Sequence, residues 1–218
     1  MTCGSRHQSA PDRAVLAWLT GPAASAPGVG ERERERGRHV QQPVELGDGL
    51  VFRELAPGDG PALAAAYVRN REHLAPWEPA RSEAFFDVET HRRDVEATIL
   101  RFEAGLAVPF VIVDGDAIVG RINLSDIVRG AFQNAHLGYW IDAEYNGRGL
   151  ATMSVGLAVH AARGIGLHRV QAGTLVHNAA SQAVLAHNGF ERFGLARRYL
   201  RIAGEWQDHV LFERLLDE

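Results

Sequence analysis

Hydrophobic and polar positions follow two periods along this chain from about residue 50 onward. Apolar residues in alternation or in short continuous runs predict strands, and apolar residues three or four positions apart predict helices. The expected strands are 50–55, 110–113, 117–124, 137–141, 168–175, 193–202 and 206–215. The expected helices are 57–74, 87–104, 149–163 and 178–188. This order predicts an α+β domain with one mixed sheet of six or seven strands and about four flanking helices.

Turn and helix-breaking residues support the bounds of these elements. Asp114-Gly115-Asp116 is a favourable turn between two apolar strands and predicts a hairpin. Pro76 and Pro79 push the residues before them out of the α region, so residues 74–79 are expected to form a loop. Gly189 directly after the last expected helix is typical of a helix C-terminus.

The first 46 residues differ in character from the rest of the chain. They contain the run Gly-Pro-Ala-Ala-Ser-Ala-Pro-Gly at 21–28 and alternating glutamate and arginine at 31–36. Such a segment has too little patterned apolar surface to build a core. We therefore expect residues 1–46 to be a disordered extension and residues 47–218 to be the folded domain.

Composition narrows the class of protein. The chain has 218 residues with a formal net charge of −4, which argues against general nucleic-acid binding. It has no apolar run long enough to cross a membrane and no basic start followed by an apolar core, so neither a membrane span nor a secretory signal is expected. Cys3 is the single cysteine, which excludes a disulfide framework. The expected location is the cytoplasm.

A glycine turn between a strand and a helix is the strongest candidate for a binding site. It reads Asn146-Gly147-Arg148-Gly149-Leu150-Ala151 and opens the helix expected at 149–163. Free backbone N–H groups and the helix dipole make a helix N-terminus attractive to anions, and two glycines let the backbone approach a phosphate closely. The turn therefore predicts a phosphate site.

Several segments together give the chain a resemblance to a known family. They include Asn70-Arg71-Glu72-His73-Leu74, Pro76-Trp77-Glu78-Pro79, Val128-Arg129-Gly130-Ala131-Phe132, Leu137-Gly138-Tyr139-Trp140-Ile141, the glycine turn, His177-Asn178-Ala179-Ala180-Ser181 and the run from Tyr199 to Leu211. With these motifs in this order, the chain from about Leu50 resembles the GNAT superfamily of N-acetyltransferases. Within it, the chain is similar to the ribosomal-protein alanine N-acetyltransferases of the RimJ type.

The resemblance implies a GNAT fold, with a sheet that splays in the middle to admit acetyl-coenzyme A, and direct attack by an amine in a ternary complex. It implies a diphosphate site at Asn146, Gly147, Arg148, Gly149, Leu150 and Ala151, where the family's usual first residue, Gln or Arg, is replaced by Asn146. It also implies that Trp140 and Ile141, through their backbone, and Asn178 hold the pantetheine arm. Ser181 would then orient or protonate the leaving sulfur, although Asn178 and Ser181 also fit a helix cap.

The general base is less well defined by the resemblance. Related enzymes often have a carboxylate just before the tyrosine of the penultimate strand, where this chain has Arg198 before Tyr199. His136 is a candidate base acting through water, because its ordinary pKa is suitable, although it also fits a solvated histidine. Tyr199 is an alternative acid, with packing in the sheet as the other interpretation.

The acceptor side is predicted from the proline-flanked loop. Trp77 and Glu78 could wall the acceptor groove, with Glu78 attracting a protonated amine and Arg198 beside it, while a tryptophan that only caps the core is the alternative. Asp208-His209 is interpreted as structural, because no serine or cysteine nucleophile accompanies it and direct transfer needs none. The histidines show no close metal-ligand spacing, so no metal is expected.

Three functions remain open from the sequence. The leading one is an acetyl-coenzyme A-dependent transferase acting on the α-amine of a protein, such as a ribosomal protein. The second keeps the chemistry but has a small-molecule acceptor, such as an antibiotic or a polyamine. The third is a non-catalytic module that binds coenzyme A or a ribosome-assembly partner. The protein is expected to be a monomer or a homodimer, with no direct nucleic-acid or membrane partner.

Overall fold

The computed structural model describes residues 42–216. Within that range the strands are β1 Val44–Gly47, β2 Leu50–Glu54, β3 Val108–Asp114, β4 Ala117–Val128, β5 Asn134–Ile141, β6 Arg169–Leu175, β7 Glu191–Ile202 and β8 Glu205–Leu215. The α-helices are α3 Gly60–Arg69, α4 Arg71–Leu74, α5 Val88–Glu103, α6 Leu150–Gly164 and α7 Ala179–His187. Two short 3₁₀ helices are η1 Glu83–Phe86 and η2 Ala143–Tyr145.

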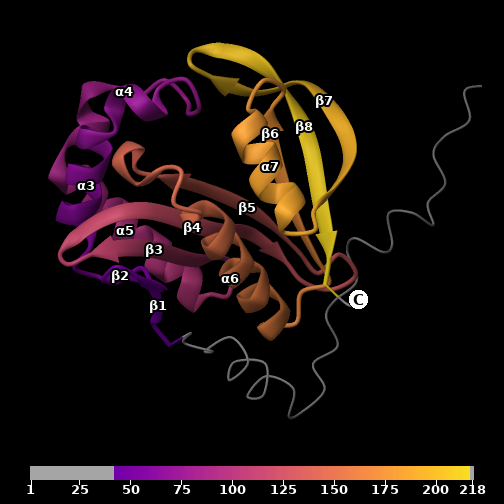
Figure 1. The fold of residues 1–218 in the computed structure, drawn as a ribbon, viewed down its shortest axis with the longest axis horizontal. Coiled ribbons are helices and arrows are strands. Elements are labelled where there is room, and N and C mark those ends of the chain that lie inside the picture. Colours follow the sequence, from indigo (N-terminus) through magenta and orange to yellow (C-terminus); the bar gives the residue numbers. More distant parts are fainter. Residues whose placement is uncertain (1–41, 217–218) are drawn as a thin grey trace, which may run out of the picture. The chain divides into compact units, whose positions relative to one another are not determined.

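All eight strands belong to one sheet in the order β1-β2-β3-β4-β5-β6-β8-β7 (Figure 1). Neighbouring strands are antiparallel except for β5 and β6, which are parallel. Parallel neighbours need a crossover connection, and here the crossover is α6, which begins directly after the glycine turn. The turn is therefore placed next to the one parallel pair.

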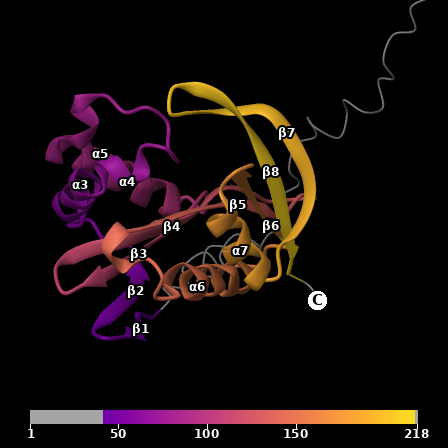
Figure 2. The same ribbon diagram turned by 45° about the horizontal axis from the view of Figure 1, so that its top comes forward.

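Helices cover the two faces of the sheet separately. In Figure 2, α3, α4 and α5 lie on one side of the strands, and α6 and α7 lie on the other. The buried residues follow this division: one apolar cluster joins the sheet to α6 and α7, and a second joins β3 and β4 to α3, α4 and α5. Alternation of side chains along each strand supplies both clusters, because successive residues point to opposite faces.

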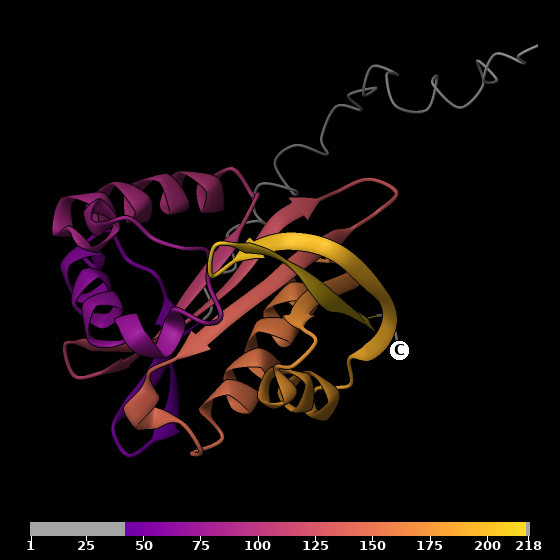
Figure 3. The same cartoon turned by 90° about the horizontal axis from the view of Figure 1, so that it is seen from above.

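The C-terminal strands β7 and β8 form a long hairpin at one end of the sheet. Seen from above, its tip curves toward the segment that follows α4 (Figure 3). A hydrogen bond joins the two, from the backbone N–H of Ala203 at the tip to the carbonyl oxygen of Glu78 at 2.9 Å. Two segments more than a hundred residues apart are thereby brought together.

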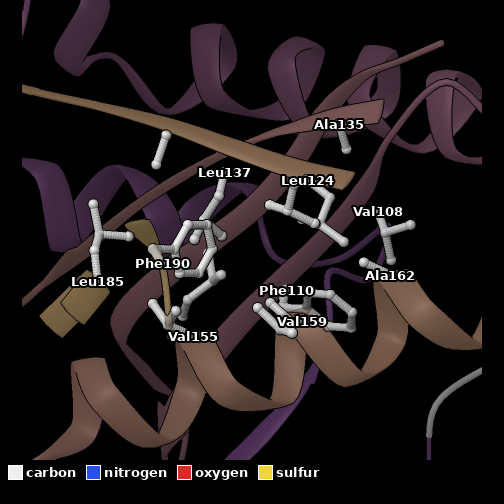
Figure 4. Close-up of a cluster of buried hydrophobic side chains, with 14 of the residues drawn as sticks. Val108, Phe110, Leu124, Ala135, Leu137, Val155, Val159, Ala162, Leu185 and Phe190 are labelled. Atoms are coloured by element: carbon white, nitrogen blue, oxygen red, sulfur yellow. The ribbon is translucent and has the colours of Figure 1, made fainter. Parts of the chain in front are cut away.

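The larger apolar cluster lies between the sheet and the crossover helix. Figure 4 shows Phe110 and Leu124 from the strands facing Val155 and Val159 of α6, with Phe190 beside them. All five side chains are buried. This packing holds α6 against the sheet and so holds the glycine turn at the N-terminus of that helix.

The structure confirms the α+β fold and the order of the predicted elements, with two differences. The sheet has eight strands, because β1 (Val44–Gly47) pairs with β2 inside the range expected to be an extension; residues 1–41 lie outside the described residues. The helix expected at 57–74 is divided at Asn70, so five α-helices are present in residues 42–216. The Asn70 side chain is buried and forms hydrogen bonds outside the helix, which explains the break.

Candidate active site

The two parallel strands separate soon after they meet. Pairing of β5 with β6 is confined to Asn134–His136 and Arg169–Gln171, yet β5 continues to Ile141 and β6 to Leu175. A cavity of about 160 Å³ lies where they diverge. Its lining comes from both strands, from the start of α7 and from Trp77. The sheet is thus open beside the backbone of residues 137–141, which agrees with the expected splay.

The glycine turn lies at the end of β5 and is exposed. Gly147 and Gly149 have φ angles of +78° and +76°, in the left-handed region that glycine adopts without strain. No side chain of the described region caps α6, whose first residue after Gly149 is the buried Leu150. The first N–H groups of α6 therefore point toward solvent at the positive end of the helix dipole, an arrangement that favours an anion.

A buried polar cluster anchors the segment that leads into this turn. The Asp142 carboxylate accepts hydrogen bonds from Arg69 Nε at 2.7 Å, Asn70 Nδ2 at 2.7 Å and the backbone N–H of Glu144 at 3.0 Å. Asn70 Oδ1 accepts from the N–H of Ala143 at 2.9 Å. Burial alone would raise the pKa of Asp142, but these hydrogen bonds and the Arg69 charge outweigh it and hold the pKa below its usual value.

The first turn of α7 brings two of the predicted residues to the cavity. Asn178 is the N-cap of α7 and accepts a hydrogen bond from the Ser181 N–H through Oδ1 at 3.0 Å, as the capping interpretation predicts. Because the cap uses the oxygen, the amide N–H₂ of Asn178 remains able to donate to a ligand. Both residues line the cavity, so capping and ligand binding are compatible at Asn178.

Tyr139 is a partner of Ser181 that the sequence reasoning did not single out. Its hydroxyl lies 2.9 Å from Ser181 Oγ and lines the same cavity. Burial raises the pKa of Tyr139 to about 12, with the Ser181 hydrogen bond opposing the shift. The phenol is therefore protonated at neutral pH. The phenol also lies 3.2 Å from the carbonyl oxygen of Ser181, and either hydroxyl of the Tyr139–Ser181 pair can be the donor. When the phenol donates to Ser181 Oγ, the serine proton is free to point toward a leaving group in the cavity.

Trp77, Glu78 and Trp140 lie around the opening, but on different sides of it. Trp77 lines the cavity beside His177, with ring centroids 5.6 Å apart. Trp140 points to the opposite face of β5, where its indole Nε1 donates to Tyr67 Oη at 3.0 Å. Glu78 lines a second cavity on that opposite face. The loop expected to wall the acceptor groove thus reaches both cavities.

Three other predicted site residues, His136, Arg198 and Tyr199, line neither cavity, so Arg198 does not lie beside Glu78 in the acceptor cavity as expected. His136 pairs with Gln171, the last residue pair before the strands separate. Arg198 has a φ of +49° in a bulge of β7, and its N–H donates to Asp208 Oδ1 at 2.8 Å. Asp208 therefore has a structural contact there. The ring of Tyr199 packs edge-on against His209.

Sequence reasoning missed several residues of the site, for identifiable reasons. His209 lines the first cavity, although Asp208-His209 was interpreted as structural. Asn70 belongs to a motif that carried the family resemblance without an assigned role. The signal that could have found Tyr139 is strand alternation, which places it on the face opposite Trp140.

Residues 42–216 contain neither a metal-binding cluster nor a membrane-spanning helix. No group of three or more His, Cys, Asp or Glu side chains is arranged to hold a metal ion. None of the helices in this range has the length and apolar character needed to cross a bilayer.

Comparison with known proteins defines the class. Residues 49–191 match the family described as Acetyltransferase (GNAT) domain, so the chain belongs to the GNAT acetyltransferase family. It is similar to [Ribosomal protein uS5]-alanine N-acetyltransferase of Escherichia coli K12, at 36% identity over 167 residues that cover 75% of this chain and 86% of the relative. The family resemblance drawn from the motifs is confirmed.

Two solved structures are similar in fold and sequence. The ribosomal-protein-S5-alanine acetyltransferase from Vibrio fischeri aligns with a TM-score of 0.77 and 35% identity, covering 81% of this chain and 97% of that one. Mycobacterium smegmatis RimJ in complex with CoA-disulfide aligns with a TM-score of 0.72 and 30% identity, covering 76% and 81% of the two chains.

Proposed function

We propose that this protein transfers an acetyl group from acetyl-coenzyme A to the N-terminal α-amine of a protein, with a ribosomal protein as the acceptor. The observation that carries this proposal is the opening between β5 and β6, with the glycine turn at one end and Ser181 beside it. The similarity to alanine N-acetyltransferases and to a RimJ structure with a coenzyme A derivative supports the choice of donor and acceptor.

The binding role of each part follows from its chemistry. The diphosphate binds the N–H groups of the turn from Asn146 to Ala151, where Gly147 and Gly149 place no Cβ in the way. The pantetheine arm lies along the free edge of β5 at residues 137–141, including Trp140 and Ile141, and takes a hydrogen bond from the Asn178 amide. A backbone N–H of this edge polarises the thioester carbonyl, which stabilises the charge that develops on its oxygen.

Ser181 acts at the leaving sulfur. Its hydroxyl is a weak acid, so its contribution is to hold a proton near the sulfur as the C–S bond breaks. The Tyr139 hydroxyl, 2.9 Å from Ser181 Oγ, fixes the serine in that orientation.

An α-amine is the acceptor that this site can use most easily. An α-amino group titrates near 7.7–8.0, so on the order of a tenth of it is neutral at pH 7, whereas lysine near 10.4 requires roughly 3–4 kcal/mol more to deprotonate. We place the reaction in the cytoplasm, where newly made ribosomal proteins present such amines.

The test is acetylation of synthetic peptides. The purified full chain is incubated with acetyl-coenzyme A and peptides that begin with alanine or serine, and thiol release and peptide mass are followed. The matched control is the same peptide with a blocked α-amine and a free lysine. Release of thiol with the free peptide alone supports the proposal. Silence across the panel, or acetylation of aminoglycosides or polyamines instead, would reject it.

A further inference from the structure

A second cavity lies on the face of β5 opposite the first one. It has a volume of about 330 Å³ and is bounded by α3, α4, the loop that follows α4, η1 and the tip of the β7–β8 hairpin. Its walls are mainly apolar and aromatic, with Tyr67, Leu74, Phe85 and Phe86 among them. A cavity of this kind can enclose the first residues of a peptide.

The two cavities approach each other at the opening of the sheet. Tyr139 lines the first cavity, and the next residue, Trp140, points the other way and donates to Tyr67, which lines the second. Trp77 lines the first cavity and Glu78 the second, so one peptide unit spans both. Because β5 and β6 are unpaired at this level, a group in the second cavity can meet a thioester in the first.

Glu78 is the one acidic residue in the lining of this second cavity within the described chain. Its side chain is 19% exposed and, among residues 42–216, forms one ion pair, with Arg81 at 3.3 Å. Its carbonyl oxygen is held by the Ala203 N–H at 2.9 Å, which fixes the residue between the loop and the hairpin tip. The other arginine of the lining, Arg71, is paired with Glu83.

We infer that Glu78 is the general base: it binds the protonated α-amine of an acceptor held in the second cavity and removes its proton. This inference rests on the proposed function and adds to it the identity of the base. A carboxylate that is largely removed from water, with one long ion pair, retains the capacity to accept hydrogen bonds from an ammonium group.

The proton balance of the step is simple. The ammonium gives one proton to the Glu78 carboxylate, and the neutral nitrogen attacks the thioester carbon. The C–S bond breaks and Ser181 delivers its proton to the leaving sulfur. As the amide forms, the nitrogen passes its second proton to Ser181, which restores the hydroxyl. Glu78 then releases its proton to solvent. Acetyl-coenzyme A and the amine are the only reactants required.

The surroundings of Glu78 strengthen its carboxylate as a base. Burial raises its pKa, and the charges of Arg81 and Arg121 oppose the shift without cancelling it. Tyr67 faces the same carboxylate, and burial raises the pKa of that phenol, so it is neutral there. A carboxylate with a raised pKa is a stronger base toward an α-ammonium than an exposed one.

The test is the isosteric variant Glu78→Gln, compared with Glu89→Gln on the exposed surface of α5, where Glu89 pairs only with Arg93 in the described structure. We expect kcat/KM for an alanine peptide to fall about 10²-fold or more in Glu78→Gln, the range for loss of a general base. Its rate should then rise about tenfold per pH unit toward the pKa of the amine near 8. Coenzyme A affinity by calorimetry should be unchanged in both variants.

A second variant tests the cavity independently of the base. Ala80 lines the cavity and is exposed, so Ala80→Phe should fill it, raise KM for the peptide at least tenfold and leave coenzyme A affinity unchanged. Wild-type kcat/KM and pH profile in Glu78→Gln would overturn the role of Glu78. If that variant misfolds, the shorter Glu78→Asp withdraws the carboxylate from the amine, and wild-type kcat/KM in Glu78→Asp would likewise overturn the role. A wild-type protein silent toward every amine would instead reject the proposed function.

Discussion

Replacing Asp142 with alanine should destabilise the domain and weaken coenzyme A binding at a distance from the ligand. The Asp142 side chain is 1% exposed, and it joins the end of α3 to the segment that enters the glycine turn. The substitution removes three hydrogen bonds at once. Asp142 also orients the Asn70 side chain, whose Oδ1 accepts a hydrogen bond from the N–H of Ala143. Without Asp142, that orientation of Asn70 would be lost.

The expected loss of stability is about 3 kcal/mol. A hydrogen bond to a charged group contributes about 1.5–3 kcal/mol. Two such bonds are lost here, from the Glu144 N–H and from the Asn70 amide, which keeps its bond to the carbonyl oxygen of Ala66 at 3.0 Å. Arg69 adds little, because its side chain is 37% exposed and still donates to the carbonyl oxygen of Ile118. For a chain of this size, about 3 kcal/mol corresponds to a decrease in Tm of roughly 6–12 °C.

Denaturant unfolding of Asp142→Ala and of the exposed control Asp116→Ala measures this difference, and calorimetry below the transition measures coenzyme A binding. The pKa of Asp142 is lowered in the folded state. The contribution of its carboxylate to the free energy of unfolding is therefore complete above the pKa of the unfolded state, and it is lost as pH falls through the pKa of the folded state. The free energies of unfolding of the two variants should therefore become similar in acid. A destabilisation below about 1 kcal/mol with normal coenzyme A affinity would refute the role assigned to this cluster.

Further predictions concern the cofactor site. Gly149→Glu should abolish coenzyme A binding, because it sets a carboxylate against the diphosphate, while the fold persists by circular dichroism; Gly149→Ala, which shares the backbone cost at a φ of +76°, should bind more tightly than the glutamate variant. Ser181→Ala should lower kcat about tenfold or more with little change in KM, and Tyr139→Phe should lower it less. Asn178→Ala removes the helix cap and should lower the free energy of unfolding by about 1 kcal/mol. It should also weaken coenzyme A binding. Unchanged stability and affinity would show that Asn178 neither caps α7 effectively nor binds coenzyme A.

The local signals in the sequence were sufficient for most of the elements and for the glycine turn. The apolar spacing placed α5, α6 and the C-terminal hairpin, because each buries one face against the sheet and that face repeats with the period of the element. The same spacing missed β1, whose four residues alternate between half-buried and exposed and are too few for a pattern. The spacing also predicted one continuous helix across Asn70, because a buried asparagine that interrupts a helix does not change the spacing of the apolar residues.

What the sequence determined by itself is the order of the elements, the glycine turn at the start of α6 and the cap at the start of α7, because these depend on residues close together in the chain. What only the tertiary structure decided is which distant residues share a site. Strand pairing and helix packing bring Tyr139 to Ser181 and Asp142 to Asn70, within hydrogen-bonding distance. They also bring the backbone of Glu78 to the tip of the β7–β8 hairpin. Contacts of that kind depend on the path of the folded chain and leave no regular spacing along it.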